Sequence, residues 1–177
     1  MTTIRKSEGF ALIDLIFVVG IIGILCGIAA PNLLQARQSS GAASAVGSLR
    51  AISSGQLTFA LTCGGGFYAP ALTDLGRAPA GSNEAFVSPN IGSDDAVIRA
   101  GYLLEMEALP FGGAPASCNG LGAGEAGLGF AAAADPLEPN STRFFALNAN
   151  GQIWEHSSSM YATIPEVGDS PLGRPLK

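Results

Sequence analysis

The hydrophobic and polar positions predict a long helix in the first third of the chain. Residues 10–30 are apolar except for Asp14. A helix over this run is about 30 Å long, the thickness of the hydrocarbon core of a bilayer. In residues 32–62, apolar positions recur at roughly helical spacing between polar ones. We therefore expect one helix over 10–62, with its first half embedded in a membrane or an assembly and its second half packed on a head.

Helix-weakening residues interrupt the apolar half. Gly20, Gly23 and Gly27 either form a face for close helix packing or mark places where the helix extends or melts. Pro31 removes one backbone hydrogen bond and is expected to kink the helix. In the second half the expected apolar stripe is Leu33, Leu34, Ala36, Ala42, Ala45, Val46, Leu49, Ile52, Phe59 and Ala60, and the expected polar faces are Gln35, Arg37, Gln38, Ser48, Arg50 and Gln56.

The remaining residues, 63–177, are expected to form a small head. The three glycines at 64–66 end the helix, and a loop follows in which Phe67, Tyr68, Leu72 and Leu75 supply apolar anchors. Residues 93–99 are expected to form a short helical turn capped by Ser93 or Asp94. Strands are expected at 102–109, 128–134, 143–147 and 152–155.

An Asn-Gly pair within 148–151 predicts a hairpin between the last two of these strands, because both residues tolerate positive φ. Three or four antiparallel strands would then pack one face on the long helix. The tail contains Pro165, Pro171 and Pro175 and is expected to be irregular.

Composition and charge limit the classes of partner. The chain has 24 glycines and 11 prolines among 177 residues, which indicates a loop-rich head with a small core. Its net charge is −5, and lysines and arginines are scattered singly after residue 31. The sequence has no electrostatic footprint for nucleic acid, and its acidity fits a soluble or surface-exposed head.

The polar leader, residues 1–9, sets the orientation of the apolar run. Arg5 and Lys6 should stay in the cytoplasm while the C-terminal part crosses the membrane. A signal-peptidase site at 29–31 is unfavourable because of Pro31, and Leu25 is not the small residue that a lipoprotein signal places before its cysteine. Two interpretations remain: an uncleaved anchor, or cleavage before the apolar run, after Gly9.

Residues 6–15, from Lys6 to Leu15, resemble the class III signal of type IV pilins and pseudopilins. The shared features are a short basic leader ending in Gly9, then Phe10, three mostly apolar residues, an acid at Asp14 and an apolar helix. Pro31 falls where many family members also have proline. The resemblance covers residues 5 to about 60. Asp14 departs from the pattern, because the family nearly always has Glu there, one methylene longer.

The resemblance implies processing and assembly. A prepilin peptidase would cut between Gly9 and Phe10 and N-methylate the new Phe10 amine. A carboxylate inside a membrane helix costs on the order of 3 kcal/mol. Asp14 of one subunit would therefore pair with the Phe10 amine of another in a filament of axially shifted helices. The alternative from the residues alone is an Asp14 that snorkels to water at the cytoplasmic interface.

Three cysteines occur in two settings. Cys26 lies in the apolar run and is expected to face the membrane. Cys63 and Cys118 lie in polar, Gly-rich segments and are expected to form a disulfide if the head is outside the cytoplasm; otherwise they are two free thiols.

No catalytic constellation emerges from the sequence. The string from Gly122 to Gly127 matches a dinucleotide fingerprint but lacks the preceding strand and following helix, so it is a flexible loop. His156, the single histidine, has no partner at metal-ligand spacing. Glu84, Asp94 and Asp95 lack the spacing of an EF-hand calcium site. The sequon-like string Asn140-Ser141-Thr142 is weak evidence for glycosylation.

These observations and the resemblance predict an α+β, type IV pilin-like fold: a long bent helix on a small antiparallel sheet. The expected divisions are a leader at 1–9, a membrane or filament-core half at 10–31, an amphipathic half at 32–62 and a head at 63–177. The expected function is a non-enzymatic filament subunit without cofactor or metal. It would wait in the inner membrane with its head in the periplasm and assemble into a cell-surface homo-oligomer through pilus or secretion machinery. The alternatives are a secretion pseudopilin, a membrane-anchored periplasmic binding module and, least favoured, a membrane-tethered enzyme.

Overall fold

The computed structural model describes residues 12–139 and 141–176. One helix, α1 (Leu12–Thr62), takes up 51 residues and continues through Pro31. The chain divides into two compact units, one ending at Ser39 and the other beginning at Ser40, and α1 runs through both. The long helix expected from the sequence is confirmed over its described length.

The first unit consists, in its described part, of α1 up to Ser39. Its large apolar side chains are open to their surroundings, with exposed fractions of 79% at Leu12 and 70% at Ile16. The helix is long and apolar enough to cross a membrane. This segment therefore requires an apolar environment that the described chain does not supply.

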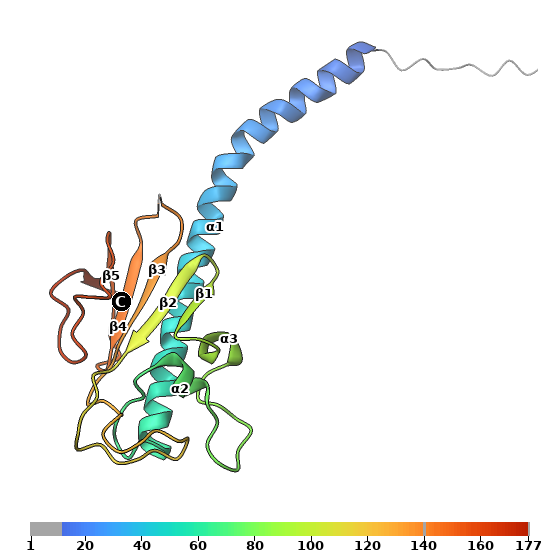
Figure 1. Cartoon of the computed structure of the whole chain (residues 1–177). Helices are drawn as coiled ribbons and strands as arrows, with labels where there is room; N and C mark the ends of the chain where they lie inside the picture. The colour runs from blue at the N-terminus through green and yellow to red at the C-terminus, as the bar shows by residue number, and fades with distance from the viewer. Residues whose placement is uncertain (1–11, 140, 177) are drawn as a thin grey trace, which may run out of the picture. The chain divides into compact units, whose positions relative to one another are not determined.

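The second unit holds a six-stranded antiparallel sheet, visible in Figure 1 beside α1. Its strands follow one another in chain order, each hydrogen-bonded to the next, so the sheet is a simple meander. The strands are β1 (Ala96–Arg99), β2 (Tyr102–Glu107), β3 (Ala131–Pro136), β4 (Phe144–Asn148), β5 (Ile153–His156) and β6 (Arg174–Pro175). The α+β architecture is confirmed, and the sheet is larger than the three or four strands expected.

The additional first strand corrects a local prediction. Residues 96–99 form β1, not part of a helical turn, and Arg99 pairs with Tyr102 across a tight turn. Both turn residues have positive φ, 49° at Ala100 and 83° at Gly101. Such a turn matches the twist of a hairpin. The sequence did not predict this hairpin because alanine rarely adopts this backbone conformation.

One face of the sheet packs on α1 and forms the main core. Alternate residues of the strands point to this face, because side chains alternate along a strand. They include Leu104 of β2, Phe145 of β4 and Ile153 of β5, which cluster with Leu49 and Ile52 of α1. From Ala42 onward the predicted apolar stripe is largely buried, with Ala42, Ala45, Leu49, Ile52, Phe59 and Ala60 in the core.

The polar-face prediction is wrong at two positions of α1. Gln56 is fully buried, and Ser48 is 4% exposed. The Ser48 hydroxyl donates to the Ser44 carbonyl oxygen, so its polarity is satisfied within the helix. Gln56 is satisfied by a loop distant in sequence, which helical periodicity alone does not reveal.

The other face of the sheet is covered by residues 157–168, which we call the C-terminal strap. Its Met160 and Ile164 cluster with Ala131, Ala146 and Trp154 of the sheet. Asn148 fastens the strap by donating to the carbonyl oxygens of Pro165 and Gly168, at 2.9 and 2.7 Å. The tail is largely irregular, yet it supplies a second core.

The segment between α1 and β1 contains two short helices, α2 (Leu72–Gly76) and α3 (Pro89–Gly92), where the sequence predicted loop. Leu72 and Leu75 are fully buried, as expected of anchors. A disulfide joins Cys63, just after α1, to Cys118, with a Cα–Cα distance of 4.9 Å. It ties the end of the helix to the Gly-rich loop before β3.

Candidate assembly surface

Asp14 lies in the first turn of the described part of α1, where its side chain is exposed. Gly9 and Phe10, the expected cleavage and methylation positions, lie outside the described residues. The pairing of Asp14 with the Phe10 amine therefore stays a prediction. The geometry does place the acid on a helix whose neighbouring side chains are almost all apolar.

The three glycines in the apolar half of α1, Gly20, Gly23 and Gly27, have no packing partner within the described chain. A Cβ added at Gly20, Gly23 or Gly27 would meet no atom within 4 Å. Close helix packing at these positions therefore requires another molecule, and both interpretations of the glycines stand. The kink expected at Pro31 also stays a prediction. Cys26 is an exposed free cysteine.

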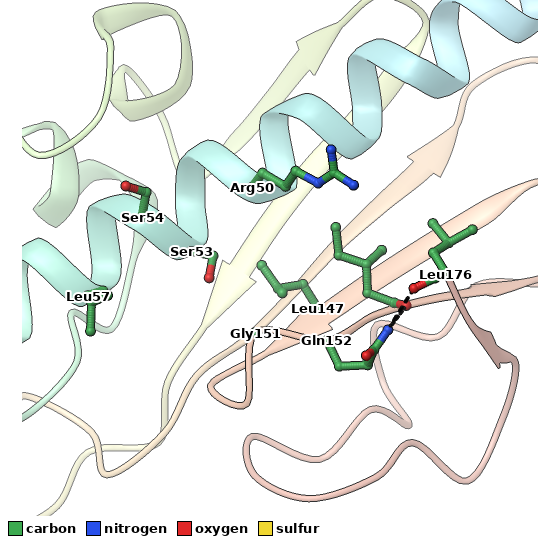
Figure 2. Close-up of a pocket in the computed structure, with 9 residues that line it drawn as sticks. Arg50, Ser53, Ser54, Leu57, Leu147, Gly151, Gln152 and Leu176 are labelled. Atoms are coloured by element: carbon green, nitrogen blue, oxygen red, sulfur yellow. Dashed lines mark hydrogen bonds between the residues drawn. The ribbon is translucent and has the colours of Figure 1, made fainter.

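In the head, a shallow groove opens between α1 and the β4–β5 end of the sheet (Figure 2). Its volume is about 360 Å³. Leu57 lies on the helix side and is 55% exposed, while Leu147 and Ile153 form part of the opposite wall. At the rim, the amide of Gln152 donates to the carbonyl oxygen of Leu176 at 3.1 Å. The groove is thus a recess lined by both polar and apolar residues.

Arg50 supplies the charge at this groove. Within residues 12–139 and 141–176, no ion pair or hydrogen bond holds its guanidinium. Ser53 and Ser54 lie beside it on α1, and Figure 2 shows the arginine extending from the helix above the groove. A free guanidinium retains its full capacity for bidentate bonds to a carboxylate.

A second charged cluster lies at the strands β4, β5 and β6. Glu155 is 8% exposed and accepts bonds from Arg143 Nε at 2.5 Å and Arg174 Nη2 at 3.1 Å. Burial pushes the pKa of Glu155 upward, but the hydrogen bonds from the two arginines outweigh it and hold the pKa below its usual value. The cluster therefore fixes β6 to the sheet through an ionised carboxylate.

The residues considered for chemistry occupy structural positions. His156 ends β5, and its Nδ1 lies 2.9 Å from the Ser158 hydroxyl oxygen. Residues 122–127 form irregular backbone before β3. Asp95 accepts bonds from the backbone amide and hydroxyl of Thr73, at 3.2 and 2.6 Å. In the described ranges, no group of three or more His, Cys, Asp or Glu side chains is placed to share a metal ion.

Sequence reasoning missed the buried amides that hold the loops of the head. Asn119 is 5% exposed, and its amide donates to the Asp74 carbonyl oxygen at 2.7 Å. Gln56 and Asn148 act in the same way on other loops. Gln56 occupies a position that continues the apolar stripe of α1, and this position was the signal that could have predicted its burial.

The features that bear on function are an unpartnered apolar helix, a disulfide-containing head and a groove with a free arginine. The long apolar helix, the antiparallel sheet packed on it and the disulfide make the architecture pilin-like. The apolar helix indicates a membrane anchor or signal, and the disulfide favours a location outside the cytoplasm. Comparison with protein-family models, with curated proteins and with solved structures returns no match to this chain.

Proposed function

We propose that the chain is a structural subunit of a type IV pilus-like helical filament. The observation that carries the proposal is the division of α1. Its apolar residues up to Leu34 are exposed, whereas from Ala42 onward one face is buried in a disulfide-containing head. Such a helix has one half for a membrane or a bundle of neighbouring helices and one half that anchors a folded domain.

The mechanism is mechanical. A prepilin peptidase removes residues 1–9, and the subunit waits in the inner membrane with its head in the periplasm. Assembly machinery then draws the apolar helix into a bundle of identical helices, and a cell-surface filament results. Close van der Waals packing at Gly20, Gly23 and Gly27 supplies contact between neighbouring helices.

The role proposed for Asp14 is to set the axial register. Its carboxylate pairs with the Phe10 amine of a neighbour, so two charges are neutralised where water is excluded. A subunit at the wrong height leaves both charges unpaired. This penalty selects one axial position for each incoming subunit.

Mass spectrometry of the mature protein tests the processing step. We expect a chain that begins at N-methylated Phe10. An intact Met1 would contradict the proposal and favour an uncleaved anchor carrying a periplasmic binding module.

Filament yield after Asp14→Ala, with membrane insertion measured in parallel, tests the assembly step. We expect a strong loss of filaments with insertion intact, and Asp14→Glu should retain assembly because it keeps the charge. Asp14→Asn is the matched control that preserves size and removes the charge. Wild-type yields from both Asp14→Ala and Asp14→Asn would contradict the charge-pairing step.

A further inference from the structure

The outward side of α1 in the head unit carries very little charge. From residue 38 to residue 73, Arg50 is the only charged residue in the sequence. The exposed positions on this side are Gly47, Arg50, Ala51, Ser54, Leu57, Thr58, Leu61 and Thr62. Leu57 and Leu61 are 55% and 76% exposed. A helix face that contacts water is normally rich in charged residues, so this composition indicates a face that becomes covered.

The groove described above lies along this same side. Its helix wall is formed by Arg50, Ser53, Ser54 and Leu57, and its sheet wall ends at the rim formed by Gln152 and Leu176. The rim is fixed, because Leu176 donates its backbone N–H to the Ile153 carbonyl oxygen at 2.8 Å. The recess is therefore already formed and needs no rearrangement to admit a side chain.

We propose that this groove receives an acidic segment from the head of a second copy of the chain. The inference rests on the proposed filament function and names the partner of the head. Charge complementarity carries the choice of occupant. In residues 40–177 acidic residues outnumber basic ones, whereas the groove carries an unpaired guanidinium. The surface of a second copy is therefore rich in the group that Arg50 lacks.

The geometry also favours a repeating contact. The groove is a recess with a cation, and the surface that enters it must project and be acidic, so the two sides of the contact differ. A contact between different surfaces of identical subunits continues indefinitely unless its rotation closes a ring. Such a head-to-head contact adds to whatever contact the apolar helices make.

The shape and charge of the groove fit other kinds of partner less well. The groove is open along one side and would leave a small molecule largely exposed, whereas small-molecule sites bury most of their ligand. A single arginine does not form the basic stripe that nucleic acid requires. A carboxylate that bonds the guanidinium while its stem lies on Leu57 satisfies both the polar and the apolar parts of the groove.

Photocrosslinking in assembled filaments tests the occupant. The variant Leu57→p-benzoylphenylalanine is incorporated into full-length chain, filaments are irradiated, and crosslinked peptides are identified by mass spectrometry. We expect dimers joined to an acidic segment within residues 63–176 of another copy. Ile98, which is 65% exposed on β1, is the matched control position. No dimer from position 57, a join to a non-acidic segment, or attachment to a different protein overturns the inference.

Charge reversal tests the role of Arg50. Arg50→Glu should lower filament yield about tenfold, because it places like charges together, whereas Arg50→Lys should keep most of the yield. Arg99→Glu, on edge strand β1, is the control and should assemble normally. Near-UV circular dichroism verifies the fold of each variant. Equal yields from wild type and Arg50→Glu overturn this inference and leave the filament function intact; absence of wild-type filaments overturns the function itself.

Discussion

The side chain of Gln56 pairs with both backbone groups of Ala69. Its Nε2 donates to the Ala69 carbonyl oxygen at 2.7 Å, and its Oε1 accepts from the Ala69 N–H at 2.9 Å. Both residues are fully buried. The pair joins α1 to the loop that leads into α2, so the loop is fixed by an amide in the middle of the apolar core.

Replacement of this amide should be costly. We expect Gln56→Leu to lower the free energy of unfolding by about 3 kcal/mol, because it leaves the buried N–H and C=O of Ala69 without partners. Urea unfolding of detergent-solubilised protein, followed by near-UV circular dichroism, measures the change. Gln35→Leu, at an exposed position of α1, is the control. Equal midpoints for the two variants would show that the Ala69 pairing contributes little.

The disulfide should contribute about as much to the free energy of unfolding as the pairing of Gln56 with Ala69. The bonded cysteines are 55 residues apart, and closing a loop of this size stabilises the fold by about 2–4 kcal/mol. Cys63→Ser combined with Cys118→Ser should lower the unfolding midpoint accordingly. Cys26→Ser should not, because Cys26 is free. Peptide mapping without reductant identifies the bond, and its absence in protein from the native compartment would contradict the predicted location of the head.

Glu155 should make stability depend on pH in the acid range. The pKa of Glu155 is lower in the folded state than the value of about 4.3 expected in the unfolded state. Its contribution to folding stability is therefore fully present at pH values above about 4.3. The contribution is lost as the pH falls through the folded pKa. Glu155→Gln should flatten this part of the stability curve and loosen β6. Glu84→Gln, on an exposed loop, should leave the curve unchanged; a matching effect from both would rule out a specific role for Glu155.

Asp135 should make stability depend on pH in the opposite direction to Glu155. Its Oδ1 is buried without a hydrogen bond, and burial raises its pKa, although a bond from Ser159 opposes the shift. Stability is therefore lost as the pH rises through its folded pKa. Asp135→Asn should stabilise the head by about 1 kcal/mol at pH 7 and have little effect at pH 3. Thermal unfolding at the two pH values measures this, with exposed Asp169→Asn as the control. A loss of stability at pH 7 would count against the burial argument.

Local patterns in the sequence determined the long helix, the strands from β2 to β5 and the Cys63–Cys118 pair. The apolar run and the stripe from Ala42 to Ala60 follow from helical periodicity, which depends on near neighbours in the chain. The hairpin between β4 and β5 follows from Asn150 and Gly151, which suit a tight turn. The helix and strand signals are readable because each is contained within a few residues, whereas the cysteine pair, 55 residues apart, was predicted from the similar polar, Gly-rich setting of both cysteines.

Tertiary structure decided the features that join distant segments. Gln56 is buried because the Ala69 loop supplies its partners, and the C-terminal strap is ordered because Trp154 and Ala146 leave an apolar face to cover. The hairpin at Ala100 is stabilised by pairing of β1 with β2 despite an unfavourable turn residue. The groove at Arg50 is lined by residues of α1, β4, β5 and the C-terminal tail, which lie far apart in the chain. These contacts depend on residues far apart in the chain, whereas sequence periodicity reports only on neighbours.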